Sequence, residues 1–260
     1  MKRQAILIGA PGSSYSLNYL HGVEFDIKNY IKFLKSPSGG AWNNSEIMSV
    51  MNPDKEKLLK LVKTIKADYV LTFFCGHGKQ SLTGHTKLAI NKTEHLTLAN
   101  LATKAPKQMF VVDACRSFAE LRSFGYLDGE FQNIPSCLTK KQARIIYDDY
   151  LKICENGTAI CYSCSIGEIS LELNDGGFFT TSLLNQTQQW VESPSELEIL
   201  PVSLALELAK KQLLINFGSA QTPQLRTKQD RQFWFPFAVK KATLPHPKIH
   251  LEYDINKLYK

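Results

Sequence analysis

Tyr69-Val-Leu-Thr-Phe-Phe-Cys-Gly-His-Gly78 is the stretch that decides the fold class. Its first seven residues are almost all apolar or small, without the alternation that a half-exposed strand would show. A second run, Met109-Phe-Val-Val-Asp-Ala-Cys-Arg-Ser117, also ends in polar residues. Continuous apolar strands are typical of parallel sheets whose two faces are covered by helices. The two stretches therefore predict an α/β protein with a mostly parallel sheet.

The rest of the chain alternates strand and helix patterns around these two stretches. Further strands are expected at 4–10, 46–51, 87–91, 157–164 and 232–239. Apolar residues at helical spacing predict helices at 24–34, 52–66, 97–103, 139–154, 178–191 and 202–217. In the second of these helices we expect Asn52 as the N-cap and Pro53 as the first helical residue. Residues 117–132 and 167–177 are expected to be loops.

Length and composition exclude several classes of protein. The 260 residues suffice for one generous domain, and 43% hydrophobic with 21% charged residues excludes a disordered chain. No apolar run approaches the ~18–20 residues of a membrane helix, so we expect no membrane association. The segment Met1–Ala10 is too short in apolar residues for a signal peptide and is expected to be a buried strand. We expect one domain over 1–240 and a polar tail over 241–260.

The net charge of +7 would favour acidic partners. Nucleic acid is one such partner, but the basic residues are scattered and accompany no nucleic-acid-binding motif. The lysines at 55–66 are typical of the solvated face of an amphipathic helix. We therefore expect no nucleic-acid function.

The chain has six cysteines but is too large to need disulfides and shows no export signal, so we expect a reducing, cytoplasmic environment. Cys161-Tyr-Ser-Cys164 is a lone C-x-x-C inside a strand-like run, whereas a zinc site would need a second pair. A redox motif would be expected at the start of a helix. We expect these two thiols to be structural.

Two polar residues stand where the buried strands end. His77 and Cys115 follow neighbouring strands, and the carboxyl ends of parallel strands meet at one edge of a sheet. A thiol and a base within reach of each other are what cysteine nucleophilic catalysis needs. Gly78 has no Cβ, so a substrate carbonyl could approach its backbone N–H. The alternative is a hydrogen-bonded structural histidine and a core cysteine.

These residues resemble the motifs of one peptidase family. Cys75-Gly-His-Gly78 is similar to the S-G-H-G motif, and Asp113-Ala-Cys115 to the D-x-C motif, of the caspase-like peptidases, most closely metacaspases and paracaspases. Supporting similarities lie at Leu20–Asp26, Cys161–Glu172, Gly176–Ser182 and Arg231–Val239. The resemblance covers Gln4–Val239. It implies a six-stranded, mostly parallel sheet flanked by helices on both faces, with a large-subunit-like part at about 1–135 and a small-subunit-like part at about 156–240.

The resemblance also implies catalytic roles. Cys115 would be the nucleophile and His77 the general acid/base, while the N–H groups of Gly78 and Cys115 would form the oxyanion hole. The family needs no cofactor for bond cleavage. Some metacaspases need calcium, but the acidic residues here lack calcium-loop spacing, so no metal is expected. Those residues are Glu46, Asp54, Asp128 and Glu130.

Specificity follows from three positions that line the pocket of aspartate-specific caspases. In those caspases the resemblance places two arginines and a glutamine there. The positions hold Leu20, Glu172 and Asp113 here, so the basic pocket is absent and two carboxylates stand in it. An aspartate side chain would be repelled, whereas Arg could pair with them bidentately. Glu168 competes with Glu172 for this role, and Asp113 or Glu172 could instead be a loop carboxylate that caps a backbone N–H.

The adjoining loop supplies the remaining substrate-binding residues. Ile169 and Leu171 are expected to flank the neighbouring apolar subsite, with Ser170 between them.

The predicted function is a cytoplasmic cysteine endopeptidase that cleaves proteins after Arg, and less well after Lys, as an effector of regulated proteolysis in cell death or defence. An activating protein partner is compatible with this function. A catalytically silent signalling or binding module on the same fold is the first alternative. A thiol redox protein and a hydrolase or transferase of another class are the others.

Overall fold

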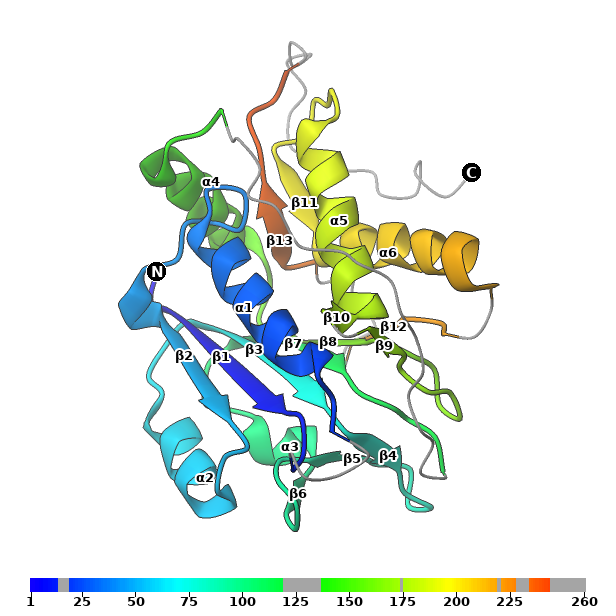
Figure 1. Cartoon of the computed structure of the whole chain (residues 1–260). Coiled ribbons are helices and arrows are strands. Elements are labelled where there is room, and N and C mark those ends of the chain that lie inside the picture. Colours follow the sequence, from blue (N-terminus) through cyan, green and yellow to red (C-terminus); the bar gives the residue numbers. More distant parts are fainter. Residues whose placement is uncertain (14–18, 119–136, 174, 219–220, 228–233, 244–260) are drawn as a thin grey trace.

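A six-stranded sheet forms the centre of the computed structural model, which describes residues 1–13, 19–118, 137–173, 175–218, 221–227 and 234–243. The strand order is β12-β8-β7-β3-β1-β2 (Figure 1). Neighbouring strands are parallel except at the β8–β12 pair, which is antiparallel. The predicted fold class is thus confirmed. The strands are β1 Arg3–Ala10, β2 Ile47–Met51, β3 Tyr69–Gly76, β7 Lys107–Asp113, β8 Gly157–Tyr162 and β12 Gln224–Thr227.

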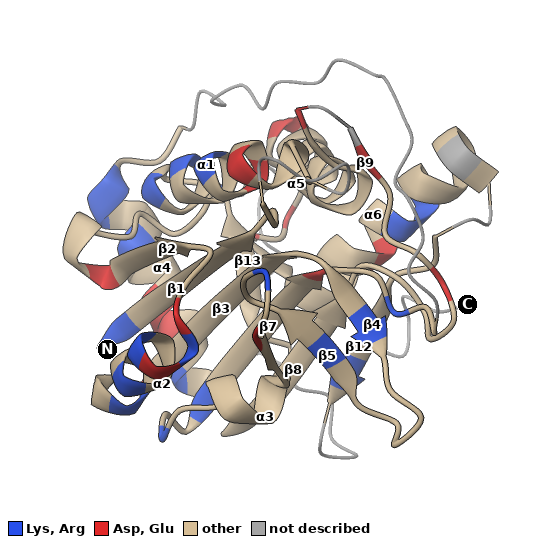
Figure 2. Cartoon of the chain, turned by 60° about the horizontal axis from the view of Figure 1, so that its bottom comes forward, with Lys and Arg blue, Asp and Glu red and all other residues tan. Residues whose placement is uncertain are grey.

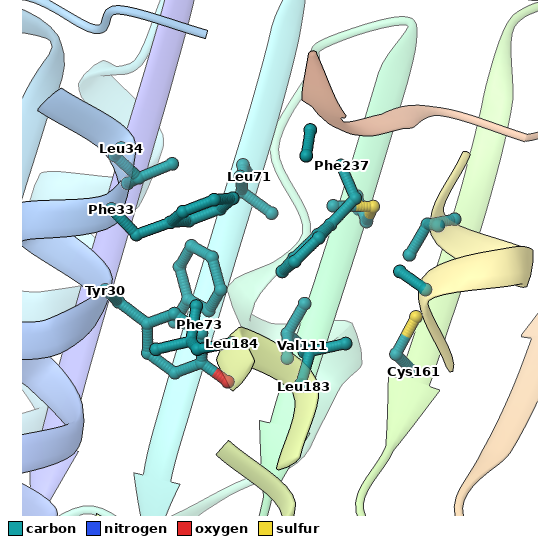
Figure 3. Close-up of a cluster of buried hydrophobic side chains, with 14 of the residues drawn as sticks. Tyr30, Phe33, Leu34, Leu71, Phe73, Val111, Cys161, Leu183, Leu184 and Phe237 are labelled. Carbon is teal, nitrogen blue, oxygen red and sulfur yellow. The ribbon is translucent and has the colours of Figure 1, made fainter. Parts of the chain in front are cut away.

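Helices cover both faces of the sheet because alternate strand residues point to opposite sides. In β1, Ala5 and Leu7 belong to the core under α1, α4, α5 and α6, whereas Ile6 and Ile8 belong to a second core under α2 and α3. In the larger core the Tyr30 and Phe73 rings lie 4.0 Å apart (Figure 3). The helices are α1 Gly22–Lys35, α2 Lys55–Thr64, α3 Leu98–Leu101, α4 Lys140–Ile153, α5 Phe178–Glu192 and α6 Val202–Phe217.

The edge of the sheet differs from the sequence-based expectation. The strand expected at 232–239 is β13, Pro236–Val239, and it pairs with β11, Ile199–Pro201, outside the main sheet. The strand at the β8 edge of the main sheet is β12, which the sequence pattern did not indicate. Gln-Leu-Arg-Thr is short and only partly buried, so it lacks the apolar run of an inner strand.

Two local expectations about helices were also wrong. The N-cap of α2 is Asp54, whose carboxylate accepts the Lys57 N–H at 2.9 Å, while Asn52 adopts a positive φ of 43°. The apolar spacing that predicted a helix at 24–34 includes Phe25, which in α1 is 44% exposed rather than on the buried face. The neighbouring Asp26 is buried in its place.

The surface charges are spread over the molecule. Lysine and arginine lie on α2 and on strands such as β5, Thr86–Ala89 (Figure 2). Within the described residues, no helix combines the length and hydropathy that crossing a membrane requires. The expected loop at 117–132 and the tail at 241–260 fall mostly outside those residues.

Candidate active site

His77 and Cys115 follow β3 and β7 at matching positions. Cys75 is the register partner of Asp113 in this parallel pair. Each site residue comes two positions later, so both leave the same edge of the sheet side by side. Both are half-buried and so accessible from solvent. The expected convergence of these two strand ends is present in the backbone.

Glycines allow the two chain segments to approach closely. A Cβ on Gly78 would lie 2.6 Å from the Cys115 carbonyl oxygen, and one on Gly76 would lie 2.5 Å from the Ala10 carbonyl oxygen. Gly78 begins β4, Gly78–Gln80, whose Gln80 N–H donates to the Ser117 carbonyl at 2.8 Å. A side chain at Gly78 would push the cysteine and histidine segments apart, and one at Gly76 would push the histidine segment away from the end of β1.

The Cys115 thiol contacts the backbone of Ser170. The Ser170 N–H donates to Sγ at 3.3 Å, and Sγ donates to the Ser170 carbonyl at 3.6 Å. Burial raises the pKa of the Cys115 thiol; the Ser170 N–H opposes this rise, and the charges of Asp113 and Glu172 add to it. The thiol is therefore held as a neutral hydrogen-bond donor.

Arg116 anchors the turn that carries the nucleophile, although the sequence motif gave it no role. Its buried guanidinium lies 3.9 Å from the centroid of the Tyr162 ring and donates to the Cys164 carbonyl at 3.0 Å. It also donates to Gln224 of β12 at 3.2 Å and to Thr86 of β5 at 3.3 Å. One side chain thus ties the cysteine turn to three separate strands or strand ends.

Asp113, the last residue of β7, is buried and faces the first turn of helix α5. Its Oδ2 accepts the Thr180 N–H at 3.2 Å and the Thr180 hydroxyl at 2.8 Å, while Oδ1 accepts the Ser170 hydroxyl at 2.5 Å. Burial raises the pKa of Asp113, and the hydroxyl and N–H donors oppose that rise. The carboxylate therefore does cap a backbone N–H, as the alternative expectation held, and it also faces the loop at Ser170.

Asp26 is the residue that the sequence analysis missed. It is buried on α1 and accepts the Gly177 N–H at 2.9 Å. A Cβ on Gly177 would lie 2.5 Å from Asp113 Oδ2 and 3.1 Å from Asp26 Oδ2, so the two carboxylates flank this glycine. Burial, and next the charge of Asp113, raise the pKa of Asp26 well above its usual range.

A usable signal for Asp26 existed in the sequence. It stands on the same helical face as Val23, Ile27 and Tyr30, where an acidic residue interrupts an otherwise apolar stripe. Buried carboxylates are rare unless they are paired. Within the described part of the chain, neither Asp26 nor Asp113 takes part in an ion pair.

The two glutamates expected to compete for the pocket lie in different environments. Glu172 begins β9, Glu172–Leu173, and its charge raises the pKa values of both Asp26 and Cys115. Glu168 instead accepts the N–H groups of Ser165 at 2.9 Å and Thr222 at 2.7 Å. The Glu168 carboxylate thus holds the loop together rather than facing the acidic pair.

The remaining predicted substrate-binding residues surround this loop. Leu20 and Leu171 are partly buried and pack against the main core, and Ile169 is also partly buried. The Gln221 side chain accepts the Leu171 N–H at 3.1 Å and donates to the Ser170 hydroxyl at 3.0 Å. Gln221, another residue without a sequence signal, therefore fixes the segment that borders Cys115.

The C-x-x-C thiols are free and buried. Cys161 lies in β8 within the core, and burial raises its pKa to about 12. Cys164 donates to the Ala114 carbonyl at 3.4 Å. No group of three potential metal ligands occurs among the described residues. Asp128 and Glu130 lie outside them, Glu46 pairs with Arg144, and Asp54 caps α2.

A family model described as the caspase domain matches residues 2–234. The chain belongs to the caspase domain family. Two solved structures are similar to this caspase domain. Caspase-1 from Spodoptera frugiperda has a TM-score of 0.58 and 17% identity, with 94% of this chain and 92% of that chain covered. A protein from Geobacter sulfurreducens has a TM-score of 0.58 and 14% identity, with 93% and 100% covered.

At these identities the two structures support the fold of the caspase domain alone. No curated protein matched it.

Proposed function

We propose that this caspase domain is a cysteine endopeptidase that cleaves proteins after Arg, and less well after Lys. The observation that carries the proposal is the alignment of β3 and β7, with Cys75 opposite Asp113. That register puts a histidine and a cysteine side by side at one edge of the sheet, next to a buried acidic pair. Protein substrates are what membership of the caspase family implies.

In the proposed reaction the Cys115 thiol gives its proton to His77 and its sulfur attacks the scissile carbonyl. The carbonyl oxygen becomes an oxyanion, for which the N–H groups of Gly78 and Cys115 are the proposed donors. The protonated His77 then gives its proton to the departing amine. A water molecule, deprotonated by His77, releases the acyl group from the sulfur. Within this scheme every step uses side chains and backbone of the chain itself.

The proposed specificity rests on Asp26 and Asp113. Two buried carboxylates that flank Gly177, with no partner cation among the residues that the structure describes, favour a positive side chain by mutual charge neutralisation. A guanidinium offers a planar set of donors that can reach two carboxylate oxygens, which a lysine ammonium does not match. Glu172 adds negative charge, and Leu20, Ile169 and Leu171 supply apolar contact for the rest of the peptide.

A catalytically silent module is the second candidate, and one observation favours it. The Cys115 thiol is bound to the backbone of Ser170, and its pKa is raised by burial. A thiol in this state is a poor nucleophile. The two candidates differ in whether substrate can release the thiol.

Matched fluorogenic peptides ending in Arg, Lys, Asp or Asn test the proposal, with calcium and chelator arms. Cleavage after Arg, lost in both Cys115→Ala and His77→Ala, is the expected result. Faster cleavage after Asp would overturn the specificity. No cleavage, together with no labelling of Cys115 by an arginyl chloromethylketone, would support the silent module.

A further inference from the structure

Ser170 touches both the nucleophile and the acidic pair. Its backbone N–H and carbonyl bracket the Cys115 sulfur at 3.3 and 3.6 Å. Its hydroxyl donates to Asp113 Oδ1 at 2.5 Å and accepts from Gln221 Nε2 at 3.0 Å. Ser170 therefore contacts both Asp113, the proposed specificity residue, and the reacting sulfur of Cys115.

We infer that Ser170 is a positioning residue that couples substrate recognition to the nucleophile: a basic side chain that binds Asp113 displaces the Ser170 hydroxyl, and the Ser170 backbone then releases the Cys115 thiol. This inference rests on the proposed function, since it assigns a regulatory step to the same site. The step is a change of hydrogen-bond partners, followed by transfer of the thiol proton to His77.

The two oxygens of Asp113 differ in how easily they can change partners. Oδ2 is bound by the N–H and the hydroxyl of Thr180, which belongs to helix α5. Oδ1 is bound by Ser170, which lies in the loop between β8 and β9. An incoming guanidinium brings a positive charge and a pair of donors to the carboxylate, whereas the Ser170 hydroxyl is a single neutral donor. It should therefore replace Ser170 rather than Thr180.

The state of the thiol follows from its acceptor. A thiolate cannot donate a hydrogen bond, so the contact from Sγ to the Ser170 carbonyl requires the protonated thiol. As long as this contact persists, the proton faces Ser170 rather than a base. A cation beside Asp113 also offsets the negative charges that raise the pKa of Cys115. Breaking the contact and neutralising the pocket thus act in the same direction.

Alkylation of Cys115 by the neutral reagent iodoacetamide measures the release without any peptide cleavage. Ethylguanidine serves as the cation and ethylurea as its neutral counterpart, and mass spectrometry resolves each cysteine. The exposed Cys137 is the internal reference. Ethylguanidine should accelerate alkylation of Cys115 at least about threefold, with no change at Cys137 and none with ethylurea.

Ser170→Ala and Ser170→Thr are the matched variants. The Ser170→Ala variant lacks the hydroxyl, so its Cys115 should be alkylated faster than Cys115 of the unaltered chain. Ethylguanidine should not accelerate this alkylation further. Ser170→Thr keeps a hydroxyl and should restore the slow rate and the acceleration. A Ser170→Ala rate equal to that of the unaltered chain, still accelerated by ethylguanidine, would overturn the coupling.

Binding of ethylguanidine is followed separately by the thermal midpoint of unfolding. A raised midpoint without acceleration of alkylation would overturn the coupling and leave the proposed specificity intact. An unchanged midpoint at saturating concentration would overturn the basic specificity, and the release step with it.

Discussion

Two clusters of buried charge lie at opposite ends of the central sheet, and they are built on different principles. At the amino end Arg3 begins β1, with its guanidinium 4.4 Å from the centroid of the Trp42 ring. It lies 3.2 Å from Asp148 and 3.7 Å from Glu46. Arg144 pairs with Glu46 at 2.5 Å. Positive and negative groups therefore balance one another there.

At the carboxyl end, Asp26 and Asp113 form a buried pair of carboxyl groups, and burial raises the pKa of both. Their donors are the N–H of Gly177, the hydroxyl of Ser170, and the N–H and hydroxyl of Thr180. In the described part of the chain no cation pairs with either carboxylate. Like charges held together without compensation cost stability, which selection tolerates where a ligand supplies the missing charge. The comparison separates a structural cluster from a candidate binding site.

The largest expected effect is that of Asp26→Asn on activity and stability together. An asparagine Oδ1 can still accept the Gly177 N–H, so the contact remains while the charge is lost. We expect kcat/KM for an arginyl peptide to fall by about a hundredfold or more, equivalent to roughly 3 kcal/mol. The thermal midpoint at pH 7 should rise. Scanning calorimetry beside peptide kinetics measures both, and a lowered midpoint would contradict the view that the pair costs stability.

At the amino end of the sheet, neutralising a carboxylate should lower the stability of the fold instead of raising it. Glu46→Gln removes the charge that pairs with Arg144 and Arg3. We expect a loss of about 2 kcal/mol in the free energy of unfolding, because Glu46 and Arg144 are only partly buried but the Arg3 side chain beside them is fully buried. Urea unfolding measures it, and peptide specificity should not change. Stabilisation by this substitution would remove the contrast between the clusters.

The two clusters should also respond oppositely to pH. Burial first, and then Asp113, raise the pKa of Asp26, so the ionised carboxylate costs stability as pH rises from about 4 through the raised pKa. The stability gain from Asp26→Asn should therefore grow with pH. Cleavage of an arginyl peptide should fall as pH drops through that raised pKa, because the protonated pocket no longer pairs with the cation.

For Glu46 the dependence of stability on pH has the opposite sign. Burial opposes its ionisation, but the bonds from Arg144 and the Asn43 N–H, with the charge of Arg3, lower its pKa below the usual 4.5. Its contribution is fully present above the usual value and is lost as pH falls through the lowered one. The cost of Glu46→Gln should shrink below about pH 4.5. Urea unfolding over a pH series measures how the stability effects of Asp26→Asn and Glu46→Gln change with pH.

The smallest expected effect is that of Glu168→Gln. The carboxylate accepts the N–H groups of Ser165 and Thr222 through one oxygen, an acceptor that glutamine retains. We expect a loss of about 1 kcal/mol in the free energy of unfolding and an unchanged ratio of Arg to Lys cleavage. Glu172→Gln is the matched control, and there the preference for Arg should weaken. A change of specificity in Glu168→Gln alone would reassign the pocket.

The inner strands and most helices could be predicted because their residues report local burial. The runs ending at Cys75 and Asp113 are continuous and apolar, and α6 spans Val202–Phe217 as expected. Strand β12 could not be predicted, because an edge strand of mixed residues is specified by its partner β8 rather than by its own pattern.

The candidate site likewise contains residues that could be predicted from the sequence and residues that could not. His77 and Cys115 could be predicted because they are polar residues at the ends of buried strands. Asp26, Arg116 and Gln221 act through contacts with segments far away in the sequence, as in the 2.9 Å bond between Gly177 and Asp26. The sequence contains only a weak signal for such contacts, namely the acidic Asp26 on an otherwise apolar helical face.

Hydrolysis of two peptides that differ only by arginine or citrulline before the scissile bond tests the acidic pocket most directly. The two side chains have nearly the same shape, but citrulline carries no charge. We predict that kcat/KM for the arginine peptide exceeds that for the citrulline peptide by about a hundredfold, or roughly 3 kcal/mol. Equal values for the two peptides would contradict the pocket's selection of a cation.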